Sequence, residues 1–454
     1  MISTFSLKIP RVLLVIFVIL NAVILFTYLF RYETLQQYKE NIKNLSGKYD
    51  YSYLSDFNFY EDSKESVIEP GKVKFRFVNP KKKKGNPKQV LDINMKKYEE
   101  VMLREIKEPK DCDIESLRPA ENPKNYKRAN ATILALVRNQ EKNKISKTIK
   151  TVENKFNSKF RYPYTFINDK PFTDSFKEKV SKLTDAPIEY VVIPSELWDK
   201  PPHIDSERER AAIESLKSQD VSYAGMQSYH NMCRFYLGNL FFVPELMKYR
   251  YYWRIEPDVE YFSELHYDIF KYLEQTKKVY GFTVSLYDIG ETITQLWPET
   301  LKFLNMDDNY KYVNPNGSFQ WLLENQQNPK KNEQTHGYST CHFWSNFEVG
   351  DMEFFRGEAY QNWFKYLDQT GNFYYERWGD APVHSVGLGL FADKRDIHWF
   401  RDIGYYHDPY YNCPNTPYTL GCEKGRFTVH PTLYDQNCIP SWIDYSMDNL
   451  DAIY

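Results

Sequence analysis

The sequence lacks several features that define common enzyme classes of this size. Neither a glycine-rich phosphate-binding loop nor a G-x-S-x-G motif occurs, which excludes P-loop kinases and α/β-hydrolases. The 59 basic side chains are balanced by 61 acidic ones, so no global positive charge favours nucleic acid, and no nucleic-acid partner is predicted. No internal repeat is visible. Aromatic residues, by contrast, make up 17% of the chain, and rings that stack on sugars would explain part of that excess.

Cysteine is scarce, and no C-x-x-C pair of a zinc site is present. The usage fits an oxidising compartment in which cysteines form disulfides. The connectivity is left open, although the last three cysteines are close enough in sequence to suggest a stapled loop. The six residues are Cys112, Cys233, Cys341, Cys413, Cys422 and Cys438.

Long apolar runs are absent except near the N-terminus. Residues 12–30 are interrupted only by Asn21 and Thr27, and such a run spans about 28 Å as a helix, close to the thickness of a bilayer core. No small-x-small cleavage site follows, which favours an uncleaved signal anchor. Lys8 and Arg11 precede the run, so the positive-inside rule predicts a cytosolic tail over residues 1–11 and a lumenal remainder.

After the anchor, the chain divides into two regions of different amino-acid composition. Residues 31–100 are polar and rich in Lys and Tyr, include the run Lys81–Lys84, and lack sustained apolar periodicity. They are interpreted as a solvated stem rather than a binding segment. Short apolar runs begin soon after Pro123. Residues 101–454 are therefore predicted to form a lumenal catalytic domain.

The apolar runs of this domain alternate with polar helical stretches, which predicts an α/β layer fold. In such sheets ligands bind beyond the carboxyl ends of the strands, so the polar residues that follow each run are the first candidates for a site. These include Arg138, Asp169 and Glu256. The predicted strands cover residues 131–137, 164–167, 188–193, 251–255 and 280–286.

The strongest local signal is Glu256-Pro257-Asp258, which ends the fourth of these strands. Two carboxylates flanking a proline suit a hard divalent cation that neutralises a diphosphate leaving group. The alternative is a turn with solvated acids. Taken alone, the motif does not decide between them.

Three further stretches carry groups that are chemically useful. Glu348 ends an aromatic segment that contains Trp344, and it either sits near an anomeric carbon or caps a helix beside core rings. Asp380 lies in a stretch dense in groups that are costly to bury unpaired. His407 lies in a segment rich in Tyr and Asp, where it would supply a nitrogen ligand.

These stretches closely resemble the fungal α-1,2-mannosyltransferase family, glycosyltransferase family 15. The signatures are "YWRIEPDVEYF", "YGFTVSLYD", "CHFWSNFEV", "FYYERWGDAPVHS" and "DIGYYHDPYYNCP", and the collinear match runs from about Asn130 to Cys413. The resemblance implies a GT-A type fold with a mixed central sheet and a type II Golgi membrane topology. It further implies GDP-mannose as donor, Mn²⁺ as cofactor and retention of the α configuration.

The resemblance also implies roles for individual residues. Glu256 and His407 correspond to metal-associated positions, and Glu348 to the glutamate proposed as nucleophile. Asp380 corresponds to an acid implicated in activity, and Tyr229 to a tyrosine near the reacting groups. On this basis Glu348, Asp380 and Tyr229 are the predicted catalytic residues.

Three other side chains are predicted to bind the donor or its metal. Arg138 and Arg234 would pair with phosphate or nucleotide. Asp258 would assist Glu256 at the metal.

The predicted acceptors are mannose-terminated N- or O-linked glycans of glycoproteins. Two departures from the family's common pattern, at His230-Asn231 and at Tyr338-Ser339-Thr340, leave the donor chemistry intact and bear on acceptor specificity. Mannosylphosphate transfer to the same glycans is the main alternative function. A glycoside hydrolase and an inactive glycan-binding protein are weaker alternatives, since every acid and the histidine of the matched signatures are present.

Overall fold

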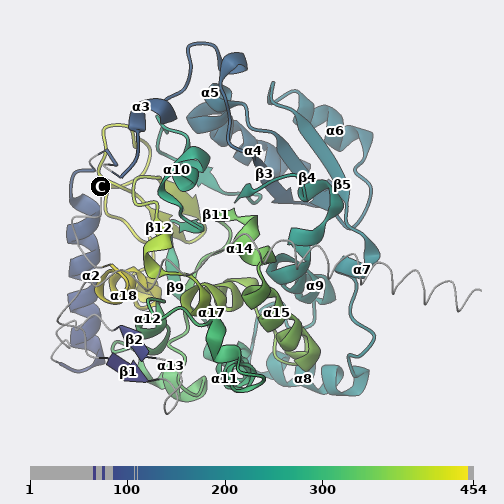
Figure 1. Ribbon diagram of the computed structural model, residues 1–454, viewed down its shortest axis with the longest axis vertical. Helices are drawn as coiled ribbons and strands as arrows, with labels where there is room; N and C mark the ends of the chain where they lie inside the picture. The colour runs from purple at the N-terminus through teal and green to yellow at the C-terminus, as the bar shows by residue number, and fades with distance from the viewer. Residues whose placement is uncertain (1–64, 68–73, 77–84, 107, 110, 448–454) are drawn as a thin grey trace, which may run out of the picture. The chain divides into compact units, whose positions relative to one another are not determined.

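A computed structural model describes residues 65–67, 74–76, 85–106, 108–109 and 111–447 (Figure 1). The predicted cytosolic tail 1–11, the predicted anchor 12–30 and most of the predicted stem lie outside these residues. Within the described ranges, no helix combines the length and the apolar character needed to cross a membrane.

A seven-stranded mixed sheet forms the centre of the fold, in the order β12-β8-β11-β6-β3-β4-β5. Strands β6, β3, β4 and β5 run parallel, while β11 lies antiparallel between β6 and β8. Strands β3 and β4 are almost wholly buried, which explains their near-continuous apolar sequences. The strands are β3 (Ala131–Leu136), β4 (Tyr164–Asn168), β5 (Ile188–Val192), β6 (Tyr251–Arg254), β8 (Tyr280–Phe282), β11 (Glu348–Asp351) and β12 (Ile397–Trp399).

The first four predicted strands are confirmed as β3 to β6, but the fifth is divided. Its beginning is β8 in the large sheet, and its end is β9 (Ser285–Tyr287), which pairs with β10 (Cys341–Phe343) in a separate sheet. A third sheet joins β7 (Glu260–Tyr261), β13 (Tyr405–His407) and β14 (Tyr410–Asn412). A two-stranded sheet joins β1 (Glu65–Val67) and β2 (Lys74–Arg76).

Four helices position the site described below: α4 (Lys142–Val152), α9 (Gln227–Arg234), α15 (Glu358–Thr370) and α17 (Asp380–Phe391). Every residue of α17 is buried, and most of them are apolar, as expected for a helix in the interior of a domain. It contacts β10 and lies beside α15 (Figure 1). The other helices are α3 (Ile114–Leu117), α5 (Ser158–Phe160), α6 (Asp174–Ser181), α7 (Ser195–Trp198), α8 (Ser206–Ser218), α10 (Ile269–Thr276), α11 (Leu296–Asn305), α12 (Phe319–Leu323), α13 (Pro329–Gln334), α14 (Met352–Arg356), α16 (Asn372–Tyr375) and α18 (Ile439–Tyr445).

Helix α2 (Pro87–Leu103) begins inside the segment assigned to the stem. A capping box formed by Asn86 and Gln89 fixes its start. Its Tyr98 is part of the hydrophobic core, and α2 contacts α18, which lies next to it in Figure 1. The predicted boundary at residue 100 therefore falls within a helix of the folded domain, because α2 uses a few widely spaced apolar residues that give little periodicity in sequence.

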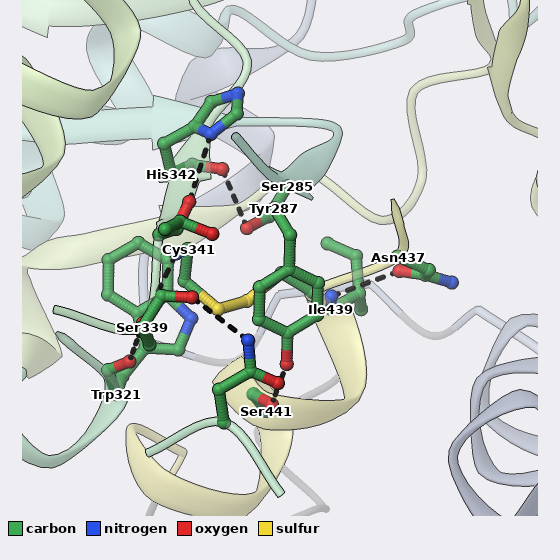
Figure 2. Close-up of a disulfide and its surroundings, with 12 residues drawn as sticks. Ser285, Tyr287, Trp321, Ser339, Cys341, His342, Asn437, Ile439 and Ser441 are labelled. Atoms are coloured by element: carbon green, nitrogen blue, oxygen red, sulfur yellow. Dashed lines mark hydrogen bonds between the residues drawn. A yellow bond between two sulfur atoms is a disulfide. The ribbon is translucent and has the colours of Figure 1, made fainter. Parts of the chain in front are cut away.

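Two disulfides are present, and one of them is the predicted staple. Cys413 pairs with Cys422, but Cys438 pairs with Cys341 and so joins the start of β10 to the start of α18 (Figure 2). Around this second bridge, Tyr287 Oη lies 2.9 Å from Ser441 Oγ. Cys112 and Cys233 carry free thiols.

The two bridges are expected to contribute unequally to stability. They close loops of 97 and 9 residues in sequence, and loop-closure entropy makes the longer one worth about 2 kcal/mol more. The double variant Cys341→Ala/Cys438→Ala should therefore lose that much more unfolding free energy than Cys413→Ala/Cys422→Ala. Denaturant titration of both variants beside the wild type measures the difference. Equal losses would contradict the assignment of the long-range bridge.

Candidate active site

A single buried arginine organises the candidate site. Arg254 ends β6 with 2% of its surface exposed. It donates from Nε to Glu256 Oε1 at 3.0 Å and from Nη1 to Asp380 Oδ2 at 2.5 Å, and Nη1 lies 3.7 Å from Glu348 Oε1. The guanidinium also packs over the ring of Tyr236, 3.5 Å from its centroid. One guanidinium facing three carboxylates leaves an excess of negative charge, which favours binding of a cation.

Glu348 is held in this cluster by strand pairing. It begins β11, directly opposite Arg254 in the antiparallel pair of β11 and β6. It has 0% exposed surface, its Oε2 accepts a hydrogen bond from Tyr280 Oη at 3.0 Å, and its buried Oε1 has no hydrogen-bond partner in the described structure. Burial raises the pKa of Glu348 to about 7, although Arg254 opposes the shift. Glu348 is thus a carboxyl group that titrates near neutral pH.

Asp380 joins the cluster from the first position of α17. Ser345 Oγ donates to its Oδ2 at 2.8 Å, in addition to the bond from Arg254. Burial on its own would raise the pKa of Asp380, but the Arg254 guanidinium outweighs this and holds the pKa below its ordinary value. Asp380 is therefore ionised at neutral pH, whereas Glu348 is only partly so.

Glu256 stands at the exposed edge of the cluster. Its backbone is fixed by Thr148 of α4, whose Oγ1 donates to the carbonyl oxygens of Glu256 at 2.9 Å and of Val259 at 3.2 Å. The side chain is partly exposed, and only its Oε1 accepts hydrogen bonds from the described residues. The Oε2 oxygen is consequently available to a ligand.

His407 approaches this edge from β13. Strand β13 pairs with β7, with Tyr405 opposite Tyr261, and continuation of this register places His407 opposite Val259, three residues after Glu256. The Nδ1 atom of His407 is buried without a hydrogen-bond partner among the described residues, and the ring packs edge-on against Trp344, with centroids 5.0 Å apart. An unpaired imidazole nitrogen and a carboxylate oxygen that accepts no hydrogen bond are donor types that suit Mn²⁺.

This pair is the whole of the candidate metal site on the protein side. In the described part of the chain, no three His, Cys, Asp or Glu side chains come together as candidate ligands of one ion. Two protein ligands are nevertheless enough for a cation that takes its remaining ligands from water and substrate phosphates. The residues present therefore fit a divalent metal that is bound together with a nucleotide diphosphate.

The structure does not bring the other three predicted binding residues into the cluster. Asp258, with a left-handed backbone at φ 63°, pairs with Lys144 at 2.5 Å. Arg138 is exposed beyond β3 and pairs with Glu141 at 3.1 Å. Their predicted contacts with the donor or its metal stay predictions.

Arg234 of α9 is held in an ion pair between two helices. It donates twice to Asp368 of α15, at 2.6 Å and 2.9 Å. Such a bidentate pair uses the same planar donors that would bind a phosphate. The geometry of Arg234 therefore does not favour the predicted contact with the nucleotide.

Tyr229, in contrast, lies beside the cluster. It is a partly exposed residue of α9, and a methyl group on Gly379, the residue before Asp380, would lie 3.9 Å from Tyr229 Oη. Its hydroxyl oxygen accepts a hydrogen bond from Arg377 Nη1 at 2.9 Å, and the exposed ring of Tyr223 stacks on it with centroids 4.8 Å apart. This arrangement agrees with a place near the reacting groups.

Sequence reasoning missed four residues of the site: Arg254, Tyr280, Ser345 and Arg377. A signal for Arg254 existed, because a charged residue inside an otherwise apolar buried strand has to find a partner. The others have no comparable signal.

The residues at which the chain departs from the common family pattern lie in the interior. His230, Asn231, Ser339 and Thr340 are all buried. His230 Nδ1, for example, lies 2.6 Å from the carbonyl oxygen of Phe373. None of the four offers an exposed side chain to an acceptor, so the suggested link to acceptor specificity is not supported.

An acidic cluster at the end of a central strand, with an oxygen and a nitrogen ligand at its edge, defines a class of protein. It is typical of α/β enzymes that act on a nucleotide diphosphate with a divalent cation. Comparison with known proteins shows which family of that class the chain belongs to.

The sequence model of the family described as Glycolipid 2-alpha-mannosyltransferase, glycosyltransferase family 15, matches residues 88–447. Probable mannosyltransferase KTR4 of Saccharomyces cerevisiae is 45% identical over 369 residues, which cover 80% of this chain and 78% of the relative. The X-ray structure of the S. cerevisiae mannosyltransferase Ktr4p in complex with GDP gives a TM-score of 0.78 at 44% identity, covering 83% of this chain and 96% of that one. Core-mannan synthase A (CmsA/Ktr4) of Aspergillus fumigatus, in an Mn/GDP form, gives 0.70 at 40% identity, covering 85% and 99%.

The chain belongs to glycosyltransferase family 15. The family resemblance is thereby confirmed, as is an α/β glycosyltransferase fold with a mixed central sheet.

Proposed function

We propose that this enzyme transfers mannose from GDP-mannose to mannose-terminated glycans of glycoproteins, forming an α-1,2 linkage with retention of configuration in a GT-A type fold. The observation that carries the proposal is the Arg254 cluster, in which three acids of the family signatures, Glu256, Glu348 and Asp380, converge at one strand end. GDP is bound by the related Ktr4p, and Mn with GDP by the related core-mannan synthase A. These relatives support GDP-mannose as donor and Mn²⁺ as cofactor here.

In the proposed site, Glu256 and His407 hold the divalent ion. When bound, such an ion neutralises the charge of a departing diphosphate. Arg254 fixes the carboxylates of Glu256 and Asp380 by hydrogen bonds, so Glu256 would offer its other oxygen to the ion from a preorganised side chain.

Glu348 is proposed to act by its charge. A role through charge is supported by burial, because Glu348 has no exposed surface and therefore offers no oxygen to the solvent side of the site. Its negative charge nevertheless stabilises the positive charge that develops at the anomeric carbon, and it does so more strongly in a buried site than in water.

We further propose that residues 12–30 anchor the enzyme in the Golgi membrane with the catalytic domain lumenal. The two disulfides support a compartment that is oxidising rather than cytosolic.

The direct test incubates the purified full-length protein with GDP-mannose, Mn²⁺ and α-methyl mannoside and identifies both products. We expect an α-1,2-linked dimannoside and GDP. Release of GMP with a phosphodiester product would instead show mannosylphosphate transfer. Glycan cleavage in the absence of GDP-mannose would show a hydrolase.

A further inference from the structure

One buried arginine near Tyr229 has no counter-ion. Arg377 lies between α16 and α17 with 7% of its surface exposed. In the described structure it forms no ion pair with a carboxylate, and Tyr229 Oη is the only acceptor of a hydrogen bond from its guanidinium. Its Nε is buried without a partner.

The other buried arginines behave differently. Arg234 and Arg254 pair with carboxylates, while Arg356 and Arg401 donate to several backbone carbonyl oxygens. A buried guanidinium without such partners is destabilising, because its charge has left water without compensation. Arg377 is therefore the exception among the five buried arginines of the described residues.

The neighbouring acids do not compensate for this charge. Glu376 Oε2 accepts from the backbone of Gln295 at 3.0 Å and from Trp378 Nε1 at 2.8 Å, so it is turned towards other partners. Asp380 is held by Arg254 and Ser345. The fold thus leaves the positive charge of Arg377 uncompensated beside the reacting groups.

The backbone at Arg377 is also strained. Its φ of 85° lies in the left-handed region, which is unfavourable for a residue other than glycine. Strain of this kind persists where the surrounding structure requires one side-chain direction. Here that direction brings the guanidinium to the Tyr229 hydroxyl, at the candidate site.

We infer that Arg377 binds the diphosphate of the donor nucleotide. A guanidinium has five N–H donors, and Arg377 has Nη2 left after the bond from Nη1 to Tyr229; unlike Nε, Nη2 is not among the buried unpartnered atoms, so it can donate to a phosphate oxygen. The bound diphosphate is the counter-ion that the folded chain lacks. This inference rests on the proposed function, because it takes the ligand to be a nucleoside diphosphate.

Calorimetric titration of the full-length protein with GDP and with guanosine tests the inference, with Mn²⁺ and again with EDTA to separate Arg377 from the metal. Arg377→Gln should weaken GDP binding about 10- to 100-fold in both conditions and leave guanosine binding unchanged. Arg377→Lys keeps the charge and removes the fork of donors, so its GDP affinity should lie between that of Arg377→Gln and that of the wild type. Arg210→Gln, on the exposed face of α8, is the matched control and should bind as the wild type.

Two results would overturn the assignment. The first is unchanged GDP affinity in Arg377→Gln. The second is an equal loss of GDP and guanosine affinity with a lowered melting temperature in both Arg377 variants, which would make the residue a brace of the site. A wild-type protein that binds no GDP would contradict the proposed function itself, and the inference with it, so the two failures are distinguishable.

Discussion

Glu256→Ala is expected to abolish measurable mannosyl transfer, as EDTA should in the wild type. Charge stabilisation by a metal is worth several kcal/mol at a departing phosphate, and each 1.36 kcal/mol is tenfold in rate, so the loss should reach about a thousandfold. Glu256 supplies the only partly exposed carboxylate of the Arg254 cluster. His407→Ala should act in the same direction and raise the Mn²⁺ concentration needed for half-maximal rate.

The control for Glu256 is Glu260→Ala, which removes an exposed carboxylate four residues further on. It should leave the Mn²⁺ titration unchanged. Full activity of the wild type in excess EDTA would refute the metal site. Unaltered Mn²⁺ titrations in both Glu256→Ala and His407→Ala would move that site elsewhere.

The parallel half of the sheet is predictable because of its burial. Strands such as β3 have both faces covered, so nearly every side chain is apolar and the run is visible in the sequence. The boundary between β8 and β9 is not visible. Thr283 and Val284 between these strands are buried and include no glycine or proline, so the chain passes from one sheet to another without a turn signal.

Strand β11 escapes prediction for an electrostatic reason. It has a carboxylate at each end, Glu348 and Asp351, which in sequence resembles a polar loop. Both acids are buried and each faces an arginine, one at the end of β6 and one just before it: Arg254 lies 3.7 Å from Glu348, and Arg250 pairs with Asp351 at 3.0 Å. These ion pairs join residues about a hundred positions apart, and only the folded sheet brings them together.

The same limit applies to the predicted site residues, because their partners in the folded chain are not visible in the sequence. Glu256, Glu348, Asp380 and Tyr229 follow from family signatures and do lie in one region of the fold. Arg234 resembles a phosphate ligand only until its partner, 134 residues further along the chain, is known. Cys438 likewise pairs outside the crowded C-terminal segment.

Glu348→Gln should lower turnover about a hundredfold, or roughly 3 kcal/mol, while GDP-mannose affinity stays near that of the wild type. The amide keeps the volume of the side chain but has no charge to stabilise the anomeric centre. In the wild type, kcat/KM should rise as pH passes through about 7, the pKa of Glu348. The variant should lose this rise.

As the pH rises, the stability of the wild type should fall while its activity increases. The pKa of Glu348 is about 7 in the folded chain against 4.5 ordinarily, so the folded state holds the proton more tightly and loses stability as the pH rises between these values. Glu348→Gln removes that loss, and the variant should melt above the wild type at about pH 8 but not near pH 4. Near-normal turnover would refute the electrostatic role. Lost turnover together with lower melting at both pH values would instead make Glu348 a structural support, because removing a support weakens the fold at any pH. A catalytic charge that is buried at a cost to stability weakens the wild type only when it is ionised.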